Sequence, residues 1–414
     1  MNRSKKIFSI KKISILSTAI ISITSFLIFN FYAMETLIIA NANFYDVTLE
    51  KVFSLNKKKT AFIFYENNFT AFNPSYLNVY TQDGYLIKNS KSKKIYLNSE
   101  FTLGKNGGIK SVFFIKNNSY ALVSSLNKNC YYAAIIELET SNILKKFPCL
   151  INNETIDFNA LGGAYVDIDN KIYLSLGVGE RLSNRNSNLA QNENSYYGKI
   201  LTINKNQFDY IKKDKKLNVE FFSLGHRNPQ GLTYINKHIY SVEHGPHGGD
   251  ELNKILKNKN YGYPHVTYGG RYNNDPSYSN SFKMSDKSVG FKDHENSRFE
   301  EPLFVLTPSV GISSVSSCPS TLKKFYKKNC LISLTLNGKN GLIIVFILND
   351  NHEKVLFHEV IRFNKPLRLR HFVTNLKNEI YEDTEGNIYV SADNEGIYKV
   401  NFFNFKKQLI TQKK

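Results

Sequence analysis

The polar residues best suited to chemistry are concentrated between Leu224 and Gly269. This stretch carries the triplet His226–Asn228 just before a turn, and His244, Asp250 and Glu251 follow a short strand-like run. Seven glycines and three prolines interrupt it, so the backbone bends repeatedly and can come close to another group. Arginine forks, imidazoles and carboxylates are the groups that bind anions, hold hard cations and move protons.

Arginine is scarce in this chain, which makes its positions informative. Only 9 of the 54 basic residues are Arg, and the others are Lys spread along the whole sequence. Where Lys is the default cation, an Arg indicates that its planar fork is required. Arg368 and Arg370 alternate within Leu367–Arg370, so a strand would place both side chains on one face, which suits a shared anion.

The net charge of +19 permits two interpretations. A strongly basic chain can bind nucleic acid or an anionic membrane. Alternatively, the chain has a general compositional bias toward Lys, Asn, Ile and Tyr. No nucleic-acid motif accompanies the charge, so we favour composition and predict no nucleic-acid partner.

Residues 1–42 are predicted to be a targeting segment rather than part of the globular fold. Four lysines, at positions 5, 6, 11 and 12, precede the uncharged run Ile13–Ala33, which has roughly the 20 residues needed to cross a bilayer. We interpret it as an uncleaved signal anchor; a signal peptide cleaved near Ala40–Ala42 is the alternative. Either arrangement keeps the positive end in the cytoplasm and predicts an exported, periplasmic domain tied to the inner membrane.

The four cysteines fit an oxidising compartment. Cys130 and Cys149 flank a hairpin-like stretch, and Cys318 and Cys330 are 12 residues apart. Two local disulfides are therefore predicted, with four buried thiols as the alternative. Neither spacing is typical of a zinc site.

The remainder of the chain predicts an all-β architecture, because short β-rich runs alternate with Asn, Gly, Asp and Lys turns. A turn followed by a strand of the type N-x-I-Y recurs at Asp169–Ser175, Asn236–Ser241 and Glu385–Ser391. About six such units lie between Phe44 and Phe405, which indicates the blades of a β-propeller over residues 43–405.

Two polar segments are expected to lie outside those blades. Asn273–Glu300 is charged and poor in strand-forming residues, so we predict a long loop between blades. Residues 406–414 form a basic tail that we expect to be disordered.

Three blocks carry a resemblance to a known family. Gly225–Leu232 (GHRNPQGL), Glu243–Asn253 (EHGPHGGDELN) and Asn260–Pro264 (NYGYP) are similar to segments of the soluble quinoprotein sugar dehydrogenases, the glucose/sorbosone dehydrogenase family. The resemblance implies a six-bladed propeller that holds pyrroloquinoline quinone (PQQ), a flat tricarboxylate, and calcium at its mouth and oxidises an aldose sugar. Loops from distant blades converge at such a mouth.

The resemblance also implies a set of cofactor-binding residues. Arg227 and Asn228 occupy the family's cofactor-binding pair, and Arg368 and Arg370 lie in a segment that looks like the family's RIRD. Asn106 stands where the family has a Gln before its Gly pair. Arginine forks suit the carboxylates of the quinone, and amides suit its carbonyl oxygens.

The metal assignment is likewise implied by the resemblance. Glu251 and Tyr261 match positions of a calcium site in bacterial aldose sugar dehydrogenases. Gly245 and Pro246 match backbone-carbonyl positions that hold the cofactor's calcium in the glucose enzymes. Carboxylate and carbonyl oxygens are the ligands that calcium takes. The alternative is that Asp250 and Glu251 simply cap turns.

The chain departs from the family at the catalytic base. In the family a His takes the proton of the sugar hydroxyl, but Ala160 stands at that position within Asn159–Ala164, and Ala164 replaces an Arg. No His occurs before His226, so a shifted alignment does not supply one. Loss of a positioned base costs about 10²–10⁴ in rate.

Two further family residues are replaced. The family's Lys in the strand matched by Leu331–Leu336 is missing, with Lys339 the nearest substitute, and His371 stands in place of the Asp that follows the arginine segment. Three functions remain open. The first is a PQQ- and calcium-dependent aldose dehydrogenase with a relocated base (His226, His244 or His371) that passes electrons to a membrane quinone or soluble acceptor. The second is a non-catalytic propeller that binds sugar, quinone or protein. The third is a structural envelope propeller.

Overall fold

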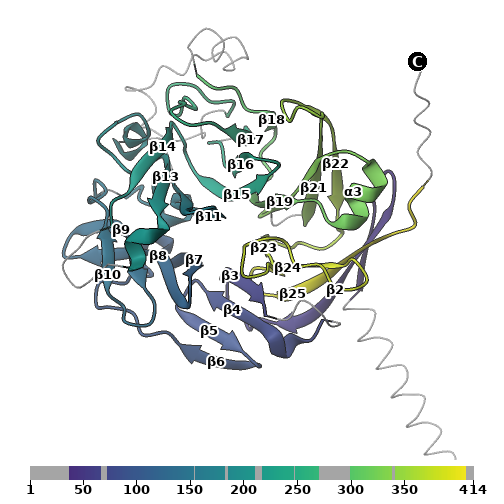
Figure 1. The fold of residues 1–414 in the computed structure, drawn as a ribbon, viewed down its shortest axis with the longest axis horizontal. Helices are drawn as coiled ribbons and strands as arrows, with labels where there is room; N and C mark the ends of the chain where they lie inside the picture. The colour runs from purple at the N-terminus through teal and green to yellow at the C-terminus, as the bar shows by residue number, and fades with distance from the viewer. Residues whose placement is uncertain are drawn as a thin grey trace, which may run out of the picture.

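The computed structural model describes residues 37–66, 72–152, 154–181, 185–209, 217–246, 248–269, 299–337 and 341–406. Six antiparallel sheets stand around a central axis (Figure 1). The predicted all-β, six-bladed propeller is therefore confirmed. The predicted anchor at Ile13–Ala33 lies outside the described residues. No helix within the described ranges has the length and apolar character needed to cross a bilayer.

Each sheet is one blade (Figure 1). The strands of each blade are given below from the axis outward. Blade 1 contains β3 (Thr60–Tyr65), β4 (Leu77–Thr81), β5 (Tyr85–Lys88) and β6 (Lys91–Lys94). Blade 2 contains β7 (Ile109–Ile115), β8 (Asn118–Asn127), β9 (Cys130–Glu137) and β10 (Ile143–Lys146). Blade 3 contains β11 (Gly162–Ile168), β12 (Lys171–Leu176), β13 (Lys199–Asn204) and β14 (Glu220–Leu224).

The second half of the ring follows the same order. Blade 4 contains β15 (Pro229–Ile235), β16 (His238–Glu243), β17 (Asp250–Ile255) and β18 (Phe304–Leu306). Blade 5 contains β19 (Ile312–Ser317), β20 (Cys330–Thr335), β21 (Leu342–Leu348) and β22 (Val355–Arg362). Blade 6 contains β23 (Leu369–Phe372), β24 (Ile388–Ala392), β25 (Gly396–Phe403), β2 (Asp46–Ser54) and β1 (Leu37–Asn41).

Helical elements are short and lie in the connections. The 3₁₀ helices and the one described α-helix are η1 (Pro74–Tyr76), η2 (Gly104–Asn106), η3 (Phe158–Ala160), η4 (Arg185–Ala190), η5 (Lys205–Asp209) and α3 (Ser320–Tyr326). Two of them, η2 and η3, immediately precede the inner strands β7 and β11. They therefore stand at the mouth of the ring, where a ligand would meet them.

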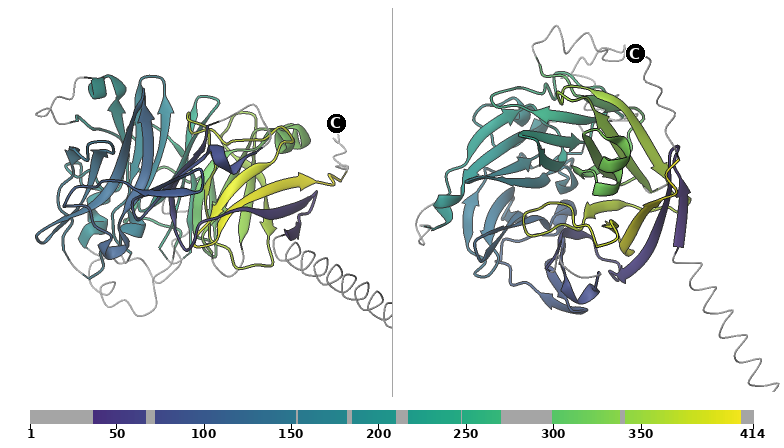
Figure 2. Two further views of the ribbon diagram at one scale, coloured as in Figure 1. Left: turned by 90° about the horizontal axis from the view of Figure 1, so that it is seen from below. Right: turned by 45° about the vertical axis from the view of Figure 1, so that its right-hand side comes forward.

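The two ends of the described chain close the ring. β2 pairs antiparallel with β25, from Asp46 opposite Phe403 to Ser54 opposite Gly396. β1 adds an outer strand against β2 (Figure 2). The propeller thus includes residues 37–41 of the segment 1–42 that the sequence assigns to targeting, because β1 pairs with β2.

The sequence repeat N-x-I-Y marks one structural position. Its three copies form β12, β16 and β24, and each is the second strand from the axis in its blade. Apolar side chains of neighbouring sheets fill the space between blades: Phe113 of β7 lies 5.7 Å, between ring centroids, from Tyr165 of β11. Burial of such rings stabilises the ring of blades and fixes the positions of the inner strands.

Both predicted disulfides are present. Cys130 and Cys149 are bonded with their Cα atoms 5.2 Å apart, and Cys318 and Cys330 are bonded with their Cα atoms 5.5 Å apart. The first ties an outer strand of blade 2 to the connection that leads to blade 3. The second ties β20 to the segment before α3.

The prediction for Asn273–Glu300 needs a correction. β17 and β18 flank this segment, and both belong to blade 4. It therefore connects two strands of one blade rather than two blades. β18 is only three residues long, so its sequence gave too little alternation to indicate a strand beyond the segment.

Candidate functional site

A cavity of about 800 Å³ lies where the inner strands and their preceding loops meet. All six blades contribute to its wall, and its volume falls within the ~300–1,000 Å³ of ordinary ligand pockets. Most residues singled out from the sequence line it: Asn106, Ala160, Arg227, Asn228, His244, Gly245, Pro246, Arg368, Arg370 and His371. Three do not: His226, Glu251 and Tyr261.

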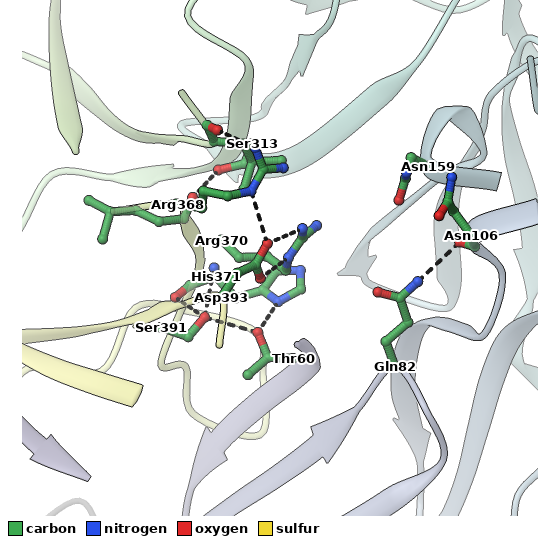
Figure 3. Close-up of polar contacts among 12 residues, drawn as sticks. Thr60, Gln82, Asn106, Asn159, Ser313, Arg368, Arg370, His371, Ser391 and Asp393 are labelled. Atoms are coloured by element: carbon green, nitrogen blue, oxygen red, sulfur yellow. Dashed lines mark hydrogen bonds and ion pairs between the residues drawn. The ribbon is translucent and has the colours of Figure 1, made fainter. Parts of the chain in front are cut away.

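Arg368 and Arg370 reach the cavity from blade 6, and one carboxylate orients both (Figure 3). Asp393 accepts from Nε and Nη2 of Arg370, both at 2.5 Å, and lies 3.5 Å from Nε of Arg368. Burial alone would raise the pKa of Asp393, but Arg370 outweighs it and holds that pKa below its ordinary value. The two guanidiniums share one negative charge, so this wall keeps a net positive charge for an anion.

Arg227 reaches the same cavity from the segment before β15. Its guanidinium donates from Nη2 to the carbonyl of Arg181 at 2.6 Å and from Nη1 to the carbonyl of His244 at 3.2 Å. Its backbone N–H donates to the buried carboxylate of Glu243 at 3.0 Å. Main-chain carbonyls thus help to hold the guanidinium of Arg227 at the cavity wall. We call Arg227, Arg368 and Arg370 the arginine wall.

His226 belongs to the core behind that wall. Its side chain is fully buried, with Nδ1 3.0 Å from Glu243 and Nε2 2.9 Å from Ser223. Its ring also stacks on Tyr261 with the centroids 4.6 Å apart. A buried imidazole with both nitrogens occupied cannot reach a substrate in the cavity, so the structure gives His226 a positioning role for the segment that carries Arg227.

His244 lines the cavity, and its partner determines its tautomer. Oδ1 of Asn228 accepts from the backbone N–H of Gly162 and from Gln230, so Nδ2 of Asn228 faces Nδ1 of His244 at 3.4 Å. Nδ1 is then the acceptor, and Nε2 of the neutral ring carries the proton. That buried Nε2 has no hydrogen-bond partner among the described residues. His244 therefore offers a ligand a donor.

His371 also lines the cavity, beside Arg370 (Figure 3). Nδ1 lies 2.9 Å from the hydroxyl of Thr60, which in turn contacts Ser391. Enclosure, followed by the charge of Arg370, lowers the pKa of His371 to about 3. The ring is thus neutral at physiological pH and a weak proton acceptor.

Asn106 stands across the cavity from the blade 6 arginines (Figure 3). Its Nδ2 donates to Asp157 at 3.1 Å, and its backbone carbonyl accepts from Gln82 at 3.1 Å and from Nζ of Lys110 at 3.0 Å. Ala160 ends η3 at the same corner. We call Asn106, Lys110 and Asp157 the lysine corner.

Sequence reasoning missed Lys110 and Asp393. Lys110 interrupts the apolar pattern of β7 two residues after the Gly107–Gly108 pair, and that position within a matched motif was the available signal. For Asp393 the signal was indirect. His371 stands in place of the family's Asp, so Arg368 and Arg370 lack a carboxylate from that position. Asp393, which directly follows β24, supplies one.

The metal candidates fall into two places. Gly245 and Pro246 line the cavity. Glu251 is buried on β17 opposite Glu243 of β16, and Nδ2 of Asn253 donates to both carboxylates. Burial, followed by the charge of Glu243, raises the pKa of Glu251. In the described part of the chain, no group of three or more His, Cys, Asp or Glu is placed to hold a metal ion.

Asp250 has a structural role. Its buried carboxylate accepts from the backbone N–H groups of Gly245, Val310 and Ile312 and from the hydroxyl of Ser309. These four bonds fasten the loop at Gly245 to the loop before β19, and both loops line the cavity. Asp250 therefore positions two loops of the cavity wall.

Six blades around a polar, cation-lined cavity define a six-bladed β-propeller with a central candidate binding site. The family model "Glucose / Sorbosone dehydrogenase" matches residues 117–399, which is well over half of the chain. The protein therefore belongs to the glucose/sorbosone dehydrogenase family.

Two curated relatives match over part of their length. The chain is 28% identical over 241 residues to the aldose sugar dehydrogenase YliI of Escherichia coli, covering 57% of each protein. It is 27% identical over 220 residues to quinoprotein glucose dehydrogenase B of Acinetobacter calcoaceticus, covering 45% of each. The chain thus spans about half the length of these relatives.

Solved structures support the same fold. The apo form of the soluble aldose sugar dehydrogenase of Escherichia coli superposes with a TM-score of 0.64 at 21% identity, covering 86% of this chain and 99% of the other. The PQQ-bound aldose sugar dehydrogenase of Streptomyces coelicolor gives a TM-score of 0.51 at 15% identity, covering 86% and 98%. At these identities the likeness concerns the fold alone.

Proposed function

We propose that this protein is a quinone-dependent dehydrogenase that oxidises a hydroxyl group of an aldose sugar in the central cavity. The observation that carries the proposal is the arginine wall. Its three guanidiniums, from the segment before β15 and from blade 6, line one cavity in a chain in which only 9 of 54 basic residues are Arg. Family membership and the similarity to an aldose sugar dehydrogenase support the substrate class.

The cavity suits PQQ in size, charge and donors. Its volume of about 800 Å³ leaves room for a flat tricyclic quinone and a sugar above it. Arg227, Arg368 and Arg370 would bind the carboxylates, for which the guanidinium fork is matched. The buried Nε2–H of His244 would donate to a quinone oxygen. When bound, the quinone supplies the acceptor for hydride.

Calcium is the second cofactor in this proposal. Carbonyl oxygens of Gly245 and Pro246, together with oxygen atoms of the quinone, would hold one ion at the cavity wall, in keeping with the oxygen preference of calcium. A separate structural ion would bind at Glu251 and Tyr261. Two adjacent buried carboxylates that share one amide donor favour a compensating cation or proton there.

The chain's own residues would orient the sugar and keep the reacting groups away from bulk water. Electrons would leave the reduced site for a membrane quinone or a small soluble acceptor. Two disulfides support an oxidising, extracytoplasmic compartment for the domain. The basic and apolar N-terminal sequence supports an inner-membrane anchor or signal peptide.

One observation favours a second candidate function, a non-catalytic quinone- or sugar-binding propeller. Ala160 lies at the cavity in place of the family's catalytic His, so this position has no group that accepts a proton.

Reconstitution separates the two. Purified protein is mixed with PQQ and calcium under anaerobic conditions, and the quinone absorbance is followed as aldoses are added. The dehydrogenase predicts one bound quinone per chain whose absorbance bleaches with sugar. Bound quinone that stays oxidised with every aldose would support the binding propeller, and absence of quinone binding would contradict the dehydrogenase.

A further inference from the structure

Lys110 projects from the inner strand β7 into the wall of the cavity. Its Nζ donates to the backbone carbonyl of Asn106 at 3.0 Å. On the neighbouring inner strand, Gly163 has φ of +109°, and a Cβ placed there would come within 2.7 Å of the Cβ of Lys110. A larger residue at 163 would displace the Lys110 side chain, so the glycine preserves its place at the lysine corner.

That corner is where the family's base is missing. Ala160 and Lys110 line the same cavity, on the adjoining blades 3 and 2. Asp157, the N-cap of the helix that ends at Ala160, contacts Asn106, whose carbonyl in turn accepts from Lys110. The amine therefore stands at the end of the cavity from which a base at 160 would act.

The surroundings of Lys110 oppose its protonation. Enclosure is the first cause and the charge of Arg370 the second, with Lys59 acting the same way and Asp157 in the opposite sense. Together they lower the pKa of Lys110 to about 7. A general base is most effective when its pKa lies near the working pH, and burial is the usual means by which a lysine reaches that range.

The other candidate bases are less suited. His226 is buried outside the cavity, and His244 has its Nδ1 against Nδ2 of Asn228 and its proton on the buried Nε2. Burial, followed by the charge of Arg370, lowers the pKa of His371 to about 3. Oδ1 of Asp157 already accepts hydrogen bonds from the side-chain N–H of Asn106 and the backbone N–H of Asn159.

We propose that Lys110 is the proton-accepting catalytic residue of this protein and substitutes for the histidine absent at position 160. The inference rests on the proposed dehydrogenase function and adds the identity of the base. Its chemistry requires a neutral amine within the cavity, which the enclosure and the neighbouring cations favour.

The step balances with the quinone as oxidant. The C–H bond of the sugar carbon breaks, and its electron pair leaves as hydride to the quinone, which is reduced. The O–H bond of the same carbon's hydroxyl breaks, its proton forms a new N–H bond on Nζ of Lys110, and the oxygen forms a C=O double bond. The sugar is oxidised by two electrons, and the ammonium later returns its proton to water.

Two substitutions test the role in the reconstituted protein. Lys110→Arg keeps the positive charge but cannot release a proton, and Lys110→Met removes the amine at similar length. Both should lower kcat about 10²–10⁴-fold at neutral pH and abolish the rise of kcat with pH around 7. Lys88→Met on the outer strand β5, which removes an exposed pair with Glu66, is the matched control and should leave kcat unchanged.

A rescue variant separates a missing base from a damaged fold. Ala160→His in the Lys110→Met background places an imidazole at the family position and should recover kcat at least tenfold. Rescue would show that the cavity lacked only a base. If Lys110→Arg and Lys110→Met both turn over within about threefold of wild type, the assignment is overturned.

The amine can also be tested without turnover. Cofactor-free protein is treated with a trace acylating reagent at several pH values, and modification of the Lys110 peptide is quantified by mass spectrometry. The rate should reach half its maximum near pH 7, whereas an N-acetyl-lysine amide reference follows its ordinary pKa of about 10.4. Bound PQQ should protect Lys110 from the reagent.

These measurements distinguish the two levels of the account. A modification midpoint that coincides with the reference overturns the Lys110 assignment whether or not the protein oxidises sugar. An active wild type with unaffected Lys110 variants overturns the assignment alone. A wild type that binds quinone but oxidises no aldose overturns the proposed function, and the assignment with it.

Discussion

The arginine wall and the lysine corner face the same cavity but are built differently. Arg370 makes a bidentate pair with the buried Asp393, and Arg227 is fastened to two main-chain carbonyls. Among the described residues, the side chain of Lys110 makes one hydrogen bond, to the carbonyl of Asn106. The first wall is rigidly preorganised, which lowers the cost of binding an anion, whereas the second leaves an amine able to gain and lose a proton.

The two walls also differ in how they relate to the family. The arginine wall keeps the residues that the family motif implies, apart from the carboxylate, which now comes from Asp393. The corner around Ala160 has lost the family's histidine and holds a lysine. The contrast indicates that cofactor binding and proton transfer are separable here. Substitutions on one wall should affect binding, and those on the other should affect turnover.

The largest effect is expected at Arg370. Arg370→Met should weaken PQQ binding about 100-fold, equivalent to about 3 kcal/mol, because the fork that meets a carboxylate is lost. It should also destabilise the fold by about 1.5–3 kcal/mol, since the buried Asp393 loses both hydrogen bonds from Arg370 and keeps only Arg368 at 3.5 Å. Calorimetric titration and chemical denaturation measure the two effects.

A double variant separates binding from stability. Arg370→Met with Asp393→Leu removes both charges and should regain most of the stability while binding stays weak. Arg362→Met, on the exposed face of β22, is the control arginine. Wild-type affinity in the double variant would mean that the arginine wall does not hold the quinone.

The next largest effect contrasts two lysines. Burial lowers the pKa of both Lys110 and Lys199 to about 7. Lys199 does not line the cavity. Its Nζ donates to the carbonyls of Leu189, Ala190 and Tyr197 at 2.8–3.0 Å. Lys199→Met should cost about 3 kcal/mol of stability, because three acceptors lose their donor. Lys110→Met should cost less than about 1 kcal/mol.

Urea denaturation of the two variants measures that contrast. Equal losses of stability would show that Lys110 is held in place as firmly as Lys199. The lysine corner would then be a structural contact, and its lowered pKa would carry no catalytic meaning.

A smaller effect concerns the metal behind the arginine wall. Calcium at 100 times its dissociation constant should raise the free energy of unfolding by about 2.7 kcal/mol. Glu251→Gln should abolish that part of the increase that comes from the ion at Glu251 and Tyr261. Thermal unfolding with and without calcium, in wild type and variant, makes the measurement. An unchanged response in the variant would place the ion elsewhere.

The smallest effect is expected at His244. If its Nε2–H donates to the quinone, His244→Gln, which retains a side-chain N–H donor, should weaken quinone binding by no more than about tenfold, or about 1 kcal/mol. The pH dependence of kcat should stay as in wild type. A variant that loses the rise of kcat with pH would make His244 the base and remove that role from Lys110.

Much of the fold is predictable from the sequence because blades repeat. The N-x-I-Y turns mark the second strand of three blades, and the cysteine spacings indicate both disulfides. The edges are less predictable. β1 was assigned to the targeting segment, because pairing with β2 depends on a partner that local pattern does not reveal.

The site is predictable where a motif encodes it. Arg227, Arg368 and Arg370 stand in recognisable blocks, and all three line the cavity. His226 stands in the same block as Arg227, but its side chain points into the core, because its Nδ1 contacts Glu243 of β16. Lys110 and Asp393 depend on groups that are distant in the sequence. The charges of Asp157 and Arg370 act on Lys110, and Arg370 pairs with Asp393, 23 residues further along the chain. Only the closed ring brings these groups together.

The most direct test of the account is a crystal structure of the protein grown with PQQ. The account predicts one quinone in the central cavity, with its carboxylates against Arg227, Arg368 and Arg370 and its reactive face open toward Lys110. A quinone bound outside this cavity, or a cavity that stays empty at saturating quinone, would contradict it.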